Sequence, residues 1–135
     1  MRNFEIVTRV AEYATESELP ELSRNLLAEA RKAAEKAYAP YSEFHVGAAL
    51  LLENGTVVTG NNQENAAYPS GLCAERVAVF AAGAQFPDIP AQAIAISCKT
   101  PHFSIDTPLS PCGACRQVLA EYESRHKQPT LKKKK

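Results

Sequence analysis

Three cysteines in two widely separated motifs constrain this chain more than any other feature of its sequence. Cys73 stands in the segment Cys-Ala-Glu-Arg, and Cys112 and Cys115 stand in Pro-Cys-Gly-Ala-Cys-Arg. Three thiolates can bind one zinc ion and leave its fourth position open to water. Because 39 positions (112 − 73) separate Cys73 from Cys112, two different elements of the fold must meet at that point. The spacing of Cys112 and Cys115 puts both sulfurs on one side of a helix start.

Glu75 lies two residues after Cys73 and is a candidate for moving protons without binding the metal. A bound zinc ion lowers the pKa of water, so that hydroxide becomes available near neutral pH. Open zinc coordination beside a glutamate that is not a ligand is the pattern of hydrolytic zinc deaminases. The alternative is that Glu75 is a carboxylate in the first turn of a helix, stabilised there by the helix dipole.

Other uses of the cysteines and histidines are weaker. A closed site of four cysteines would need Cys98, which lies within an apolar strand pattern with no second ligand nearby and is typical of a small core residue. A redox dithiol at Cys112 and Cys115 would leave the segment around Cys73 unexplained. None of the histidines has a partner at zinc spacing, and we expect structural or surface roles for them: His45, His102 and His126.

The composition indicates one ordinary soluble globular domain. The 135 residues contain 15 basic and 15 acidic side chains, but four of the basic ones form the run Lys132–Lys135. Without that run, 11 basic residues face 15 acidic ones, a net charge of −4, which argues against a nucleic-acid partner. No apolar run is long enough for a membrane span, and the start of the chain lacks the apolar core of a signal peptide. Four cysteines without such a signal favour the cytoplasm.

The predicted order of elements is helix, strand, strand, helix, strand, helix, which indicates an α/β layered fold. Ser17 is expected to cap the first helix, and Asn54-Gly55 to form a hairpin turn. The alternation of Phe4, Ile6, Thr8 and Val10 predicts an additional strand. The predicted helices run from Leu19 to Pro40, from Leu72 to Gln85 (apolar face Val77, Phe80, Ala81, Ala84) and from Pro111 onward (apolar face Val118, Leu119, Tyr122), and the strands span Phe44–Glu53, Thr56–Thr59 and Ala93–Cys98.

Several further segments, taken with the cysteine motifs, resemble the small homotetrameric cytidine deaminases. They lie between Arg31 and Gln117 and read Ala-Tyr-Ala-Pro-Tyr-Ser (37–42), Phe-His-Val-Gly-Ala-Ala-Leu (44–50) and Gly-Asn-Asn-Gln-Glu-Asn-Ala-Ala-Tyr (60–68). The resemblance implies a three-layer α/β/α fold with a mixed sheet and one Zn2+ per chain. It also implies a homotetramer that deaminates cytidine and deoxycytidine in pyrimidine salvage.

The resemblance assigns roles to individual residues. Glu75 would take a proton from the water, protonate N3 of cytosine and then protonate the leaving amino group. Asn62 and Glu64 would bind the ribose hydroxyls, and the Glu64 carboxylate would repel a 3′-phosphate. The remaining implied roles are packing against the nucleoside (Phe44), contact of backbone with the base carbonyl (Ala74), contributions across a subunit boundary (Ala66, Tyr68) and hydrogen bonds to the zinc-bound sulfurs (Arg76, Arg116).

The C-terminal part departs from the resembled pattern. That family continues after the third helix with two strands and a helix, whereas this chain passes from Lys127 through Leu131 into lysines. We therefore expect an N-terminal extension at 1–16, an incomplete domain at 17–131 and a lysine tail at 132–135. We also expect the strand at Ala93–Cys98 to lack a neighbour on one side. The alternatives to a cytidine deaminase are a deaminase of a modified cytosine nucleoside and an inactive, zinc-stabilised fragment.

Overall fold

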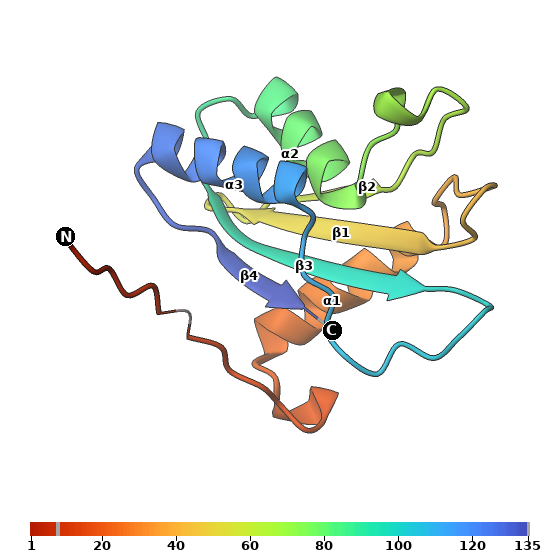
Figure 1. Cartoon of the computed structure of the whole chain (residues 1–135), viewed down its shortest axis with the longest axis horizontal. Helices are drawn as coiled ribbons and strands as arrows, with labels where there is room; N and C mark the ends of the chain where they lie inside the picture. Colours follow the sequence, from red (N-terminus) through yellow and green to blue (C-terminus); the bar gives the residue numbers. More distant parts are fainter. Residues whose placement is uncertain (8, 135) are drawn as a thin grey trace.

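A computed structural model describes residues 1–7 and 9–134, and within it a four-stranded sheet is enclosed by helices on both faces (Figure 1). The strand order is β2-β1-β3-β4, with β1 antiparallel to both β2 and β3 and β4 parallel to β3. The mixed sheet and the three α/β/α layers confirm the predicted fold class. The elements are α1 (Glu21–Ala34), β1 (His45–Leu52), β2 (Val57–Asn61), α2 (Ala74–Gln85), β3 (Ala91–Lys99), α3 (Gly113–His126) and β4 (Leu131–Lys134), with short 3-10 turns η1 (Glu16–Glu18) and η2 (Tyr68–Ser70).

The apolar core lies in two layers, one on each face of the sheet. Alternate residues of β1 contribute side chains to the two layers, because successive side chains of a strand point to opposite faces. Ala49 and Leu51 pack with the helix α1, whereas Ala48, Leu50 and Leu52 pack with α2 and Leu119 of α3. Burial of both faces explains why β1 reads as a continuous apolar run.

Two glycines let the helices approach the sheet at main-chain distance. A Cβ atom built on Gly47 would lie 2.0 Å from the carbonyl oxygen of Ala30 in α1. On the other face, a Cβ atom on Gly60 would lie 2.4 Å from the backbone nitrogen of Ala78 and 2.6 Å from the carbonyl oxygen of Ala74, both in α2. The first turn of α2, which follows Cys73, is therefore seated directly on β2.

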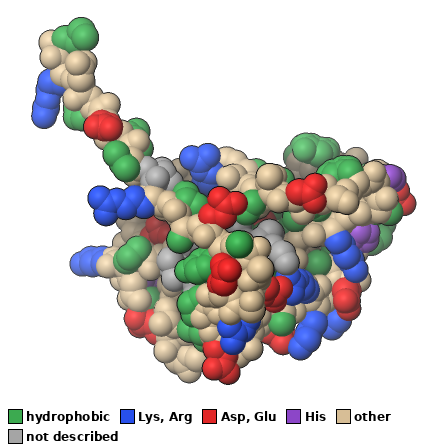
Figure 2. Space-filling view, turned by 90° about the horizontal axis from the view of Figure 1, so that it is seen from below, with side chains coloured by type: hydrophobic (Ala, Val, Ile, Leu, Met, Phe, Trp, Pro, Cys, Tyr) green, Lys and Arg blue, Asp and Glu red, His purple; other side chains and the backbone are tan. Residues whose placement is uncertain are grey.

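The N-terminal predictions need correction. The described residues before η1 contain no strand; they form an arm that projects from the body (Figures 1 and 2), and Phe4, Ile6 and Val10 on it are exposed. Thr8 lies outside the described residues. The first helix begins at Glu21, with Pro20 as its N-cap. Ser17 lies within η1, so its predicted capping role is wrong: Pro20 fixes an extended backbone just before the helix.

The apolar face of α2 is rotated from the predicted one. Its buried residues are Ala74, Glu75, Ala78, Val79 and Ala82, whereas Phe80 and Ala84 are exposed. The prediction placed the larger apolar side chains inward, but the close contact at Gly60 selects small residues for the buried side. The apolar face of α3 is as predicted, with Leu119 buried and Val118 and Tyr122 packed against the core.

The described part of the lysine run, Lys132 to Lys134, belongs to the sheet. Leu131–Lys134 forms β4 and pairs in parallel with β3, from Ala93 opposite Leu131 to Ile96 opposite Lys134. The prediction that the strand around Ala93–Cys98 would lack a neighbour is therefore wrong. Lysine has a long side chain but an ordinary backbone, and ladder pairing uses only the backbone. Lys135 lies outside the described residues.

Among the described residues, no helix combines the length and the apolar character that crossing a membrane would require. On the face of the molecule shown in Figure 2, basic and acidic side chains are interspersed rather than gathered by sign.

Candidate active site

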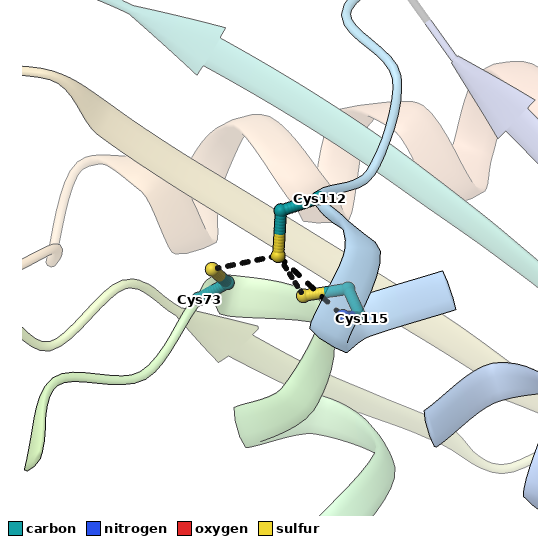
Figure 3. A group of neighbouring side chains, drawn as sticks. All are labelled: Cys73, Cys112 and Cys115. Atoms are coloured by element: carbon teal, nitrogen blue, oxygen red, sulfur yellow. Dashed lines mark hydrogen bonds between the residues drawn. The ribbon is translucent and has the colours of Figure 1, made fainter. Parts of the chain in front are cut away.

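The three cysteines singled out in the sequence lie together at the N-terminal ends of two helices (Figure 3). The Sγ atoms of Cys73 and Cys112 are 3.7 Å apart, and those of Cys112 and Cys115 are 3.4 Å apart. All three sulfurs lie within 4.8 Å of one another. Cys73 is the N-cap of α2, and Cys112 is the N-cap of α3, where its sulfur accepts a hydrogen bond from the backbone N–H of Cys115. We call these three residues the thiol cluster.

The dimensions of the thiol cluster fit zinc. Zn–S bonds of about 2.3 Å in tetrahedral geometry put neighbouring sulfurs roughly 3.8 Å apart. The sulfur separations here are close to that value. Cys115 is fully buried and Cys112 is exposed, so the cluster has an open side. Three thiolates with one open side constitute the donor set of a catalytic rather than a closed structural site.

The electrostatic environment favours a thiolate at Cys73. A hydrogen bond from the Cys115 thiol, together with the Arg76 guanidinium, lowers the pKa of Cys73 to about 5, against an opposing effect of burial. The same hydrogen bond to Cys73 and the burial of Cys115 raise the pKa of the Cys115 thiol. The positive ends of α2 and α3 face the sulfurs and further favour negative charge there.

The two arginines beside the cysteines differ. The Nη2 atom of Arg76 donates to the Cys73 sulfur at 3.6 Å, and its Nε atom is buried without a hydrogen-bond partner in the described part of the chain. Arg116 is exposed on α3, and none of the contacts described for residues 1–7 and 9–134 joins it to a sulfur. Of the two arginines predicted to offset the sulfur charge, the structure brings only Arg76 to the cluster.

Glu75 is buried in the first turn of α2, beside the thiol cluster. Only 6% of the surface of Glu75 is exposed to solvent. Burial raises the pKa of Glu75 above its usual value, and the negative charge of Cys73 acts in the same direction. A carboxyl group with a raised pKa can hold a proton nearer to neutral pH, as a general acid–base must. Glu75 lies in the first turn of α2, as both the proton-transfer role and the helix-dipole alternative predict, and its burial beside the thiol cluster favours the first.

Phe44, Asn62 and Glu64 form a second group, joined by hydrogen bonds to the start of β1 and to the chain just before it. The amide of Asn62 accepts from the N–H of Val46 at 2.7 Å and donates to the carbonyl of Phe44 at 2.9 Å. The carboxylate of Glu64 accepts from the N–H of Tyr41 at 2.9 Å. We call the set Ser42, Phe44, Asn62 and Glu64 the Phe44 network.

Ser42 completes the Phe44 network and was not singled out from the sequence. Its hydroxyl donates to Glu64 and accepts the N–H of Phe44 at 3.1 Å. The hydrogen bond from the Ser42 hydroxyl, together with those from the N–H groups of Tyr41 and Ser42, lowers the pKa of the Glu64 carboxyl. The only sequence signal for Ser42 was its place in the segment 37–42.

Backbone pairing ties the Phe44 network to the metal centre. Gln63 lies between Asn62 and Glu64 of the network and exchanges backbone hydrogen bonds with Leu72, at 2.9 and 3.0 Å. Leu72 directly precedes the first cysteine. Gln63 also pairs, on the side away from Leu72, with Tyr38. The N–H of Tyr38 donates to the carbonyl of Asn62 at 3.0 Å. The chain therefore keeps both groups at the same end of the molecule.

The other predicted contact residues occupy contrasting positions. Ala74 is fully buried at the start of α2, where the backbone N–H groups of a first turn have no partner within the helix. Ala66 and Tyr68 lie on the surface, with Tyr68 91% exposed in η2. Cys98 is half-buried in β3 and apart from the thiol cluster, and burial raises the pKa of its thiol.

Two residues of the loop between β3 and α3 also reach this region. Phe103 stacks on Phe44, and the Nε2 atom of His102 lies 2.7 Å from the carboxylate of Glu43. Nothing in the sequence predicts these contacts, because the loop has no periodic pattern and its partners are almost sixty residues away.

Comparisons with known proteins agree with this geometry. Residues 20–128 match the family described as the cytidine and deoxycytidylate deaminase zinc-binding region. A cytidine deaminase of Sporosarcina psychrophila is 50% identical over 97 residues, which cover 72% of this chain and 67% of that protein. One from Mycobacterium tuberculosis is 44% identical over 105 residues, 77% of this chain and 74% of that protein.

Solved structures give the same result. The crystal structure of cytidine deaminase from Burkholderia pseudomallei superposes with a TM-score of 0.63 at 48% identity, covering 70% of this chain and 72% of that one. The Mycobacterium tuberculosis enzyme gives a TM-score of 0.66 at 39% identity, covering 82% and 86%. The fold and the three-thiolate site therefore define a zinc-dependent deaminase. The chain belongs to the cytidine and deoxycytidylate deaminase family.

Proposed function

We propose that this protein hydrolyses cytidine and deoxycytidine to uridine and deoxyuridine, with release of ammonia. The observation that carries the proposal is the meeting of three sulfurs within 4.8 Å beside the buried carboxyl group of Glu75. Its relatives named cytidine deaminases, at up to 50% identity, support the same substrate class.

Cys73, Cys112 and Cys115 would hold the zinc ion, which supplies an activated water as the nucleophile. Glu75 accepts a proton from the attacking water and delivers one to N3 of cytosine. Once the water oxygen is bonded to C4, Glu75 takes the remaining proton from that hydroxyl and passes it to the amino group, which leaves as ammonia when the C4–N bond breaks. Burial raises the pKa of the Glu75 carboxyl above its usual value, which is the direction that suits a group that must both accept and donate a proton. Arg76 balances part of the negative charge on Cys73.

Asn62 and Glu64 each retain one hydrogen-bonding position toward a sugar hydroxyl. Asn62 uses one of its two amide hydrogens on Phe44, and Glu64 receives three hydrogen bonds of the about four that a carboxylate accepts. A ribose hydroxyl can accept from Asn62 and donate to Glu64 at the same time. A 3′-phosphate can do neither as well, because it lacks the donor and repels the carboxylate.

The resemblance to the small homotetrameric cytidine deaminases supports an inference about assembly and location. We infer a homotetramer in which the exposed Ala66 and Tyr68 face a neighbouring subunit, and a place in pyrimidine salvage. The four cysteines are all free thiols, which supports a reducing, cytoplasmic setting.

The test is ammonia release from cytidine by the zinc-loaded chain. Cytidine and deoxycytidine should both be converted, with absorbance changes that match uridine formation. A chain that binds one zinc but releases no ammonia would instead support an inactive zinc-stabilised fragment. Turnover of a modified cytosine nucleoside in place of cytidine would support the other deaminase reading.

A further inference from the structure

The loop between β3 and α3, residues 100–110, folds back onto the residues that open β1. The rings of Phe103 and Phe44 stack with centroids 6.3 Å apart and planes 29° apart. The neighbouring residues pair as well, with His102 Nε2 and Glu43 Oε2 at 2.7 Å. Two consecutive residues of the loop thus hold two consecutive residues at the strand start. Cytidine deamination as proposed above assigns neither His102 nor Phe103 a role.

The backbone of Phe44 is already fixed on both sides. Its N–H donates to the hydroxyl of Ser42 at 3.1 Å, and its carbonyl accepts from Asn62 at 2.9 Å. The ring is therefore the part of Phe44 that can still rotate. Stacking by Phe103 restricts that rotation. Phe103 is 61% exposed, so this contact lies outside the apolar core.

The residue before Phe44 has an uncommon backbone conformation. Glu43 has φ 51, in the left-handed region that costs a non-glycine residue free energy. Its N–H donates to the carbonyl of Ala39 at 3.0 Å, and its carboxylate meets His102. Such a conformation persists where neighbouring contacts hold it, and here it turns Glu43 and Phe44 toward the loop.

We propose that Phe103 is a positioning residue of the nucleoside site, which orients the ring of Phe44 for a planar pyrimidine base before the substrate binds. The inference rests on the proposed function, because it needs Phe44 to line the nucleoside site. A ring already oriented loses less conformational freedom on binding, so the gain falls on substrate affinity rather than on the chemical step. The exposed His102–Glu43 pair also holds the loop to the strand start, and it contributes less to the orientation of Phe44 than the stacking of Phe103 does.

The first experiment compares steady-state kinetics of Phe103→Ala with the unchanged chain. An aromatic pair adds enough free energy to predict a rise in KM for cytidine of about two- to tenfold, with kcat within about twofold. Phe103→Tyr keeps the ring and should restore KM. Leu109→Ala removes another exposed apolar side chain of the same loop and should leave KM unchanged. An unaltered KM in Phe103→Ala, or a fall in kcat alone, would overturn the proposal.

A double-mutant cycle tests whether Phe103 acts through Phe44. If it does, Phe103→Ala should raise KM little further in a chain that already carries Phe44→Ala. Additive effects of the two substitutions would mean that Phe103 acts elsewhere, and would overturn the proposal. The melting temperature and zinc content of each variant serve as controls for folding.

A binding readout separates this inference from the proposed function. The chain has no tryptophan, so Phe103→Trp introduces a single indole beside Phe44. Its fluorescence should change saturably with uridine, the product, at concentrations near those that inhibit turnover. If the unchanged chain deaminates cytidine but this fluorescence does not respond, the inference fails and the proposed function stands. If the unchanged chain releases no ammonia from cytidine, it is the proposed function that fails.

Discussion

The thiol cluster and the Phe44 network are built in different ways, although the chain keeps them at the same end of the molecule. The thiol cluster lies at the N-terminal ends of two regular helices, where its member Cys115 and the adjacent Glu75 are buried. The Phe44 network lies on irregular chain, and side-chain hydrogen bonds to backbone groups hold it together. The metal centre therefore depends on rigid packing, whereas the substrate side depends on a few polar contacts near the surface.

The largest expected effect tests the rigid side of this comparison. Cys73→Ala should lose most of the zinc and, with it, measurable turnover, because two thiolates do not complete the site. Metal analysis of the purified protein checks the loss. The matched control is Cys98→Ala, which removes a half-buried cysteine outside the cluster and should keep one zinc per chain. Loss of zinc from Cys98→Ala alone would overturn the assignment of an open three-cysteine site.

Glu75→Gln should keep the zinc and the fold but lower kcat by roughly 10²–10⁴-fold. Glutamine has nearly the same shape and burial, but it cannot exchange protons. Turnover measured at saturating cytidine, together with zinc content, separates this effect from loss of metal. A variant with about half the normal kcat would show that Glu75 does not transfer the protons.

Glu64→Gln tests the polar side of the comparison. Hydrogen bonds to a charged group contribute about 1.5–3 kcal/mol, so kcat/KM for cytidine should fall by roughly 10- to 100-fold. Cytidine 3′-phosphate should be a very poor substrate of the unchanged chain. In the variant, the kcat/KM values for cytidine and for its 3′-phosphate should differ by a smaller factor. Equal rates on cytidine and its 3′-phosphate in the unchanged chain would remove Glu64 from the ribose site.

The smallest expected effect concerns stability in acid. The hydroxyl of Ser42 and nearby N–H groups lower the pKa of Glu64 below its ordinary value of 4.5. A carboxyl group with a lowered folded-state pKa stabilises the fold above the unfolded-state pKa, and this contribution is lost as the pH falls through the folded-state pKa. The melting temperature should therefore drop less between pH 5 and about pH 3 in Glu64→Gln than in the unchanged chain. Parallel curves would show that the network adds no stability.

The same division explains what the sequence could predict. The spacing of Cys112 and Cys115, and the helical pattern that begins at Leu72 beside Cys73, were enough to predict cysteines at two helix starts, because a helix start is a local structure. The continuous apolar run around Leu50 was enough to predict a buried strand. Both predictions depend on neighbouring residues only.

Features that depend on distant contacts were missed or misplaced. The predicted buried face of α2 was wrong. The close contact between the α2 backbone and Gly60, not the size of Phe80, decides which side of the helix is buried. The pairing of β4 was missed because lysines carry no apolar pattern, although their backbone pairs like any other. The contact between Phe103 and Phe44 joins an irregular loop to a strand start, and no local pattern marks either partner for the other.

The main-chain contact at Gly60 has a consequence for changing the substrate of this protein by directed evolution. The carbonyl of Ala74, between Cys73 and Glu75, rests against β2 with no room for even a methyl group. Repacking of core side chains therefore cannot shift Glu75 relative to the sheet by small steps, as it would where side chains separate the layers. Variation that alters substrate range is better directed to the surface segments 41–44 and 100–110, where a library can vary side chains without moving the catalytic turn.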